Sequence, residues 1–72
     1  MNENINLSLY IISIRIGNSV EYLPLDTFAA FCDKFLFDEI CDLLAQSPLS
    51  AVIYSGFRNK TKFVLQIYPK SN

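Results

Sequence analysis

Two cysteines, Cys32 and Cys41, are the side chains in this sequence best suited to nucleophilic chemistry. A thiol reacts as its thiolate, and acidic or apolar surroundings raise its pKa and lower its reactivity. Asp33 directly follows the first cysteine and Asp42 the second, with large apolar residues around both. The chain has no histidine that could serve as a general base. We therefore expect a protein that is not an enzyme.

The same residues give little support for a metal or cofactor site. There is no histidine and no Cys-x-x-Cys pair, and the only glycines are Gly17 and Gly56, so neither a zinc site nor a glycine-rich phosphate loop is expected. On one straight helix the two cysteines would lie on opposite sides and ~13 Å apart along the axis. A disulfide needs Cα atoms within about 7 Å. The cysteines are expected to be small buried hydrophobic residues, and no cofactor is predicted.

Charge is divided along the chain. Residues 1–42 carry a net charge of −5, whereas residues 43–72 carry +4 and no acidic residue. Three of the cations, Arg58, Lys60 and Lys62, lie between phenylalanines in the segment 56–63, a pattern typical of loops that bind nucleic acid. Lysines at a hairpin tip also keep sheet edges from pairing, and a pI of about 5.0 is a poor match for phosphate binding. Nucleic-acid binding is therefore the alternative hypothesis.

The elements that position these residues begin with a hairpin. Residues 5–16 are dense in β-branched and aromatic residues and predict a long strand, followed by a three-residue loop over 17–19 and a second strand over 20–23. This loop places Arg15 opposite Glu21. Pro24 interrupts the pairing, and Asp26 is expected to cap a helix over 27–46 that Ser47 and Pro48 end.

A second hairpin is predicted from 49–57 and 62–68. A five-residue loop, 58–62, pairs Phe57 with Phe63 and gives one nearly all-apolar face, whereas a four-residue loop would set Phe57 against Lys62 and mix the two faces. We therefore predict the longer loop. The other face would then carry Val52, Tyr54, Val64, Gln66 and Tyr68.

Together these elements predict a single α+β domain over residues 1–72. Its order is ββ-helix-ββ, with a four-stranded, mainly antiparallel sheet and one helical layer. One layer covers one face of the sheet and leaves the second face uncovered.

The helical segment contains two apolar stripes that do not line up. Phe28, Phe31, Cys32 and Phe35 follow the i, i+3, i+4, i+7 spacing, and so do Phe37, Ile40, Cys41 and Leu44, rotated by roughly 100–200°. Two alternatives remain open. Either the helix is kinked near Leu36–Asp38, with Asp38 capping its second part, or it is straight and Phe37 is exposed to a partner.

The apolar content favours function by contact. A chain of 72 residues buries only about 60 % of its unfolded surface, yet 51 % of its residues are hydrophobic and 14 % aromatic. The amino-terminal segment lacks the basic region and cleavage site of a signal peptide, and its apolar run is too short to span a membrane, so a cytoplasmic protein is expected.

The leading hypothesis is a small adaptor, regulator or inhibitor that acts by protein–protein interaction and forms a homodimer. Within this hypothesis we expect a protein of a phage or mobile element that blocks a host complex that handles nucleic acid. The residues expected to contact a protein partner are Phe37, Asp38, Glu39, Asp42, Tyr54 and Tyr68.

Overall fold

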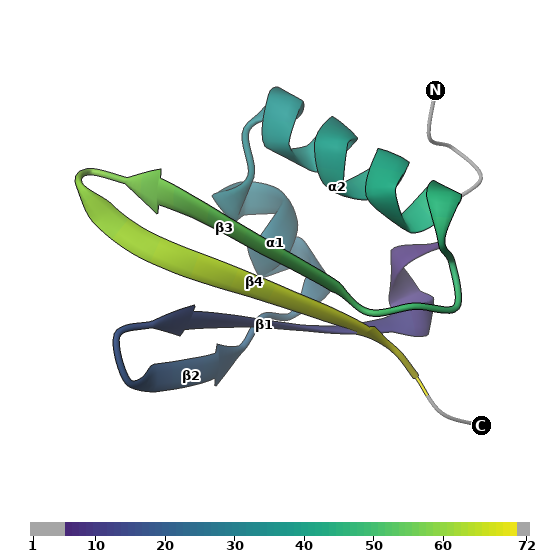
Figure 1. Ribbon diagram of the computed structural model, residues 1–72, viewed down its shortest axis with the longest axis horizontal. Coiled ribbons are helices and arrows are strands. Elements are labelled where there is room, and N and C mark those ends of the chain that lie inside the picture. The colour runs from purple at the N-terminus through teal and green to yellow at the C-terminus, as the bar shows by residue number, and fades with distance from the viewer. Residues whose placement is uncertain (1–5, 71–72) are drawn as a thin grey trace.

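The computed structural model describes residues 6–70 as a four-stranded antiparallel sheet with two helices on one of its faces (Figure 1). The elements are a 3-10 helix η1 (Leu7–Leu9), β1 (Tyr10–Ile16), β2 (Ser19–Tyr22), α1 (Leu25–Phe31), α2 (Lys34–Gln46), β3 (Val52–Arg58) and β4 (Thr61–Pro69). The strand order is β2-β1-β4-β3, so the predicted α+β fold is confirmed. Within residues 6–70 no helix is long and apolar enough to cross a membrane.

The first hairpin is tighter than the sequence suggested. Its loop has two residues, 17–18, and the strands pair Arg15 with Val20, so the predicted pairing of Arg15 with Glu21 is wrong by one position. Gly17 has a φ of 61°, the conformation that a type II′ turn gives its first central residue and that glycine adopts without steric cost. The predicted strand over 5–16 begins only at Tyr10, after η1; residue 5 lies outside the described residues.

The second hairpin also closes through two residues. Asn59 and Lys60 both have positive φ, 52° and 66°, as a type I′ turn requires. Phe57 pairs with Lys62. The predicted five-residue loop is therefore wrong, and the register of the rejected four-residue loop is the observed one. A two-residue primed turn matches the right-handed twist of the strands, and here it prevails over the matching of apolar side chains.

The corrected register exchanges the two faces of β3. Val52 and Tyr54 pair with Ile67 and Leu65, which are fully buried, and therefore face the helices. On the same face Gly56 lies under the ring of Phe63, where a Cβ atom would come within 2.8 Å of the ring. The absence of a side chain at Gly56 lets this ring lie across β3.

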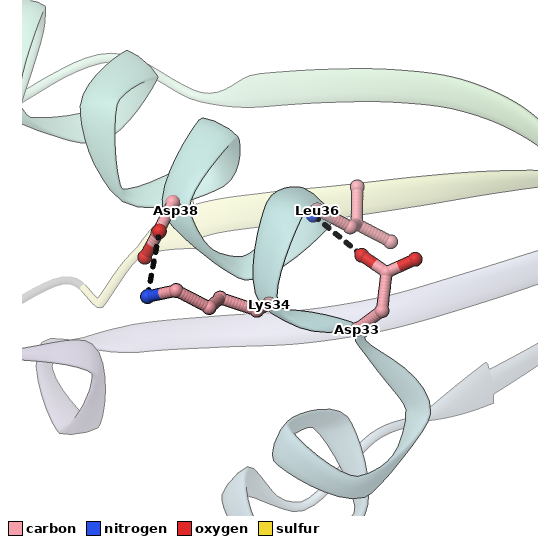
Figure 2. A network of polar contacts seen from close by, with 4 residues as sticks. All are labelled: Asp33, Lys34, Leu36 and Asp38. Carbon is pink, nitrogen blue, oxygen red and sulfur yellow. Dashed lines mark hydrogen bonds and ion pairs between the residues drawn. The ribbon is translucent and has the colours of Figure 1, made fainter.

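The helical layer breaks at residues 32–33, so the straight helix is excluded and the predicted kink near Leu36–Asp38 occurs earlier. Asp33, rather than Asp38, caps α2: its carboxylate accepts a 2.8 Å hydrogen bond from the backbone N–H of Leu36 (Figure 2). Asp26 does not cap α1. It lies within the first turn of that helix and accepts a hydrogen bond from the N–H of Thr27.

The break explains how both apolar stripes reach one core. Phe28 on α1 is fully buried, and the ring of Phe37 on α2 lies 6.0 Å from it. Phe37 is therefore partly buried, not exposed, whereas Phe35 points to solvent with 83 % of its surface accessible. The core between helices and sheet consists of Leu7, Ile12, Ile14, Leu23, Phe28, Leu36, Ile40, Cys41, Leu44, Phe63, Leu65 and Ile67.

Candidate functional site

The face of the sheet opposite the helices is left uncovered by residues 6–70 and carries six exposed large hydrophobic residues. We call it the open face. Side chains alternate across a strand, so the strand registers assign its members: Ile11, Ser13, Arg15, Val20, Tyr22, Ile53, Ser55, Phe57, Lys62, Val64, Gln66 and Tyr68.

Large hydrophobic residues dominate the open face. Phe57 is 72 % exposed, Tyr22 67 % and Tyr68 46 %, and Ile11, Val20 and Ile53 are each about half exposed. Val64 is buried at the centre of the sheet, although no helix lies over it. All four strands thus contribute apolar side chains to the open face.

Two uncharged polar residues at the centre of the open face are hydrogen-bonded to each other. Ser13 and Gln66 are opposite each other on β1 and β4, and the Ser13 hydroxyl donates a 3.1 Å hydrogen bond to Gln66 Oε1. A polar pair that already has its hydrogen bond costs less to remove from water than two unpaired groups. The centre of the open face is therefore suited to being covered.

The charges of the open face gather at one end of the sheet, the turn end, where both hairpin loops lie (Figure 1). Arg15 and Lys62 line a hollow of about 200 Å³ together with Gly17 and Val64. The Arg15 guanidinium lies 3.4 Å from the carbonyl oxygen of Gly17, to which it donates, and so reaches toward this end. Ile11 and Tyr68 occupy the opposite end, where Lys70 follows β4 and its backbone N–H donates a hydrogen bond to the carbonyl oxygen of Leu9.

No acidic residue of the described segment 6–70 lies on the open face. Glu21 pairs with the buried Ile14 and so lies on the helix-facing side. The remaining carboxylates belong to the helical layer or its connections: Asp26, Asp33, Asp38, Glu39 and Asp42. The described carboxylates therefore lie on the helical side of the molecule, whereas Arg15 and Lys62 lie on the open face.

The predicted partner-binding residues are split between these sides. Phe37, Asp38, Glu39 and Asp42 lie on α2, where Asp38 forms an ion pair of 3.5 Å with Lys34 (Figure 2). Tyr54 faces them: partial burial, the charges of Glu39 and Asp33 and a hydrogen bond with Glu39 raise its pKa.

Tyr68 alone of the predicted set lies on the open face. Sequence reasoning did not select Ile53 and Phe57 for this surface, because it placed β3 in the wrong register. The Gly-Asn loop of the first hairpin carried a signal that could have corrected the register of β2 on β1. Glycine in the first of two loop positions is typical of a type II′ turn.

The three cations of the alternative hypothesis do not form one group. The Arg58 guanidinium lies 4.1 Å from the centre of the Phe31 ring and donates a 2.6 Å hydrogen bond to the Phe31 carbonyl oxygen. It is therefore turned toward the helices. Lys60 lies in the loop and Lys62 on the open face.

The thiols are free and have raised pKa values. Burial raises the pKa of Cys32 to about 11; Arg58 opposes this shift and Asp33 adds to it. The pKa of Cys41 is raised by burial and by Asp38 and Asp42. In residues 6–70 no three His, Cys, Asp or Glu side chains come together in a group that could hold a metal ion.

Comparison of the chain with protein-family models, curated proteins and solved structures finds no significant match. The surfaces described above therefore carry the functional argument by themselves.

Proposed function

We propose that the protein acts by non-covalent contact with protein through its open face, as an adaptor, regulator or inhibitor rather than as a catalyst. One observation carries this proposal: the open face exposes six large hydrophobic residues, and no element among residues 6–70 covers it. Monomeric proteins rarely expose contiguous apolar patches larger than a few hundred Å², and larger patches are typically interaction sites.

The layout of the open face supports a protein partner. Protein interfaces have a centre depleted of charge, enriched in aromatic residues and bordered by a polar rim. Here six exposed large hydrophobic residues surround the buried Val64 and the paired Ser13 and Gln66, and the side chains of the cations Arg15 and Lys62 reach toward one end.

Nucleic-acid binding is less well supported. Base stacking uses aromatic side chains on which successive bases can lie, together with cations that track the backbone. Tyr22, Phe57 and Tyr68 are on three different strands, and aliphatic and polar residues separate them. Arg58, one of the three cations of that hypothesis, contacts Phe31 instead. Nucleic-acid binding is therefore the less supported alternative, and the experiment below would detect it.

A quantitative pull-down with matched surface variants tests the proposal. An Ile53→Asp/Phe57→Asp variant places charge on the open face at two exposed positions, and Phe35→Asp does the same on the helical side. Proteins bound by the wild type, including the protein itself, should be lost from the first variant and kept by the second, with circular dichroism confirming that both fold. Equal binding by all three would contradict the proposal. A salt-sensitive electrophoretic shift that disappears in Lys60→Ala/Lys62→Ala would support nucleic acid instead.

A further inference from the structure

We infer that the open face binds the open face of a second copy of this chain, in a two-fold symmetric sandwich in which the turn end of each sheet covers the end of the other that carries Ile11 and Tyr68. This inference rests on the proposed function, because it names the partner of the same surface. Three features support it: the area of the face, the position of its charges and the fit of Tyr68 to the hollow at the turn end.

The area is of the size that a dimer needs. Summed over Tyr22, Phe57 and Tyr68, the exposed surface equals that of nearly two complete aromatic residues. At the area that an aromatic side chain usually buries, this amounts to roughly 300–450 Å². Together with the half-exposed Ile11, Val20 and Ile53 and the polar side chains between them, the open face approaches the ~800 Å² per partner of a stable interface.

The charges select one of two symmetric arrangements. If the two-fold axis ran parallel to the strands, both turn ends would coincide, and Arg15 and Lys62 of each copy would meet without any carboxylate nearby. If the axis runs across the strands, each cationic end lies over Ile11 and Tyr68, and Lys70, which follows β4 there, is the cation that the other copy adds. Like charges placed opposite each other oppose association, so the second arrangement is favoured.

An axis across the strands brings Tyr68 to the cations of the other copy. Lys62 and Tyr68 both lie on β4, three residues to either side of Leu65. An axis above Leu65 therefore places the partner's Tyr68 over Lys62, at the hollow that Arg15 also lines. Sheets pack face to face at about 30°, which keeps this central strand near its partner. A cation beside the face of a tyrosine ring is a favourable contact.

The same axis leaves the hydrogen bond at the centre of the open face intact. Gln66, whose side chain is already paired with Ser13, comes to lie against the partner's Val64. Arg15 reaches toward Gly17 at the turn end, so its charge stays near the solvent-accessible rim. No charged group has to be buried without a partner, which would be costly.

Sedimentation velocity over a range of concentrations tests the dimer. The wild type and the control Phe35→Asp should sediment as dimers, and Ile53→Asp/Phe57→Asp as a monomer. A wild-type monomer at every concentration would overturn the inference. If the wild type is a monomer but still captures other proteins through Ile53 and Phe57, the proposed function stands and the open face binds a different protein. If it captures no protein, or if this face binds nucleic acid in a salt-sensitive way, both the inference and the proposed function are overturned.

The orientation has its own test at Tyr68. Tyr68→Glu would face the partner's Lys62 and should keep the dimer, with a dissociation constant that rises with salt. Tyr68→Lys would set cation against cation and should raise the dissociation constant by about tenfold or more over the Glu variant, and adding Lys62→Glu should restore it. Equal weakening by Glu and Lys at this position, or no rescue by the charge exchange, would overturn the proposed arrangement.

Discussion

The guanidinium of Arg58, at the end of β3, lies 4.1 Å from the centre of the Phe31 ring and donates a 2.6 Å hydrogen bond to the Phe31 carbonyl oxygen at the end of α1. The last carbonyl groups of a helix lack intrahelical partners and attract cations. Phe31 also meets Phe63 edge to face, with ring centres 5.1 Å apart. One side chain thus joins the tip of the second hairpin to the helical layer.

Replacing Arg58 with alanine should lower the free energy of unfolding by about 1–2 kcal/mol, since both the cation–π contact and a hydrogen bond from a charged donor are lost at an exposed site. Arg58→Lys should retain part of this stability, because lysine keeps the charge but not the planar group. Urea denaturation measures the difference. Lys60→Ala is the control, because Lys60 is a cation in the neighbouring loop. If Arg58→Ala lowers the free energy of unfolding no more than Lys60→Ala does, the contact with Phe31 is contradicted.

This contact also shows where sequence reasoning ended. The order of elements followed from local signals: β-branched runs, Pro24 and the Ser47-Pro48 stop. The role of Arg58 did not, because it depends on Phe31, 27 residues away. Within the sequence, Arg58 and Lys62 looked alike; the fold turns one toward the helices and the other onto the open face.

The registers were missed for a local reason. A shift of one residue exchanges every side chain between the two faces of a strand. Matching apolar partners gave five loop residues, whereas the backbone accepts Asn59 and Lys60 at positive φ and closes with two. The uncovered second face was foreseen from the single helical layer, but its membership depended on this register, so Tyr54 was placed there in error and Phe57 was left out.

Two phenylalanines two positions apart should respond differently to truncation. Phe35 is 83 % exposed, so Phe35→Ala should change the free energy of unfolding by no more than about 0.5 kcal/mol. Phe37 packs against Phe28 and the core, and Phe37→Ala should cost about 2 kcal/mol, less than the ~3–5 of a fully buried ring. Thermal or chemical unfolding of both variants compares them directly. Equal losses would mean that α2 is rotated from the position described.

The cap of α2 should be sensitive to one carboxylate. Asp33→Ala removes the acceptor for the N–H of Leu36 and should cost about 1 kcal/mol, as at other helix N-caps. Asp33→Asn is the matched control, because asparagine caps helices about as well as aspartate. Helix content by circular dichroism and the midpoint of urea unfolding report the effect. An Asn variant as unstable as the Ala variant would assign the effect to charge instead of capping.

The loop of the second hairpin offers a stabilising change. Lys60 holds a φ of 66°, which costs a residue with a side chain but not glycine. Lys60→Gly makes an Asn-Gly loop, the sequence most favoured by type I′ turns, and should raise the free energy of unfolding by about 0.5–1 kcal/mol. Gly17→Ala is the opposite control: Gly17 has a φ of 61°, so an alanine there should lower the free energy of unfolding. Destabilisation by Lys60→Gly would exclude the two-residue turn and the register of β3 that follows from it.

The raised pKa of Cys32 should appear in its reactivity. A pKa of about 11 instead of 9.0 leaves roughly a hundredth of the thiolate near neutral pH. The greater intrinsic nucleophilicity of a more basic thiolate compensates in part, so alkylation of this residue near pH 8 should be about tenfold slower than that of an unstructured cysteine peptide. Mass spectrometry of iodoacetamide-treated protein measures the rate at each cysteine.

The same shift has a consequence for stability at alkaline pH. The thiol of Cys32 loses its proton near pH 8.5–9 in the unfolded chain and only near 11 in the folded protein, so above about pH 8.5 the unfolded state binds fewer protons. The free energy of unfolding should therefore fall as the pH rises from about 8.5 toward 11, and the raised pKa values of Cys41 and Tyr54 act in the same direction. Urea midpoints at about pH 8 and pH 10 measure this loss, which should be smaller in Cys32→Ala, because that variant has lost one of the three groups. An equal loss in Cys32→Ala and wild type would show that the thiol ionises alike in the folded and unfolded states.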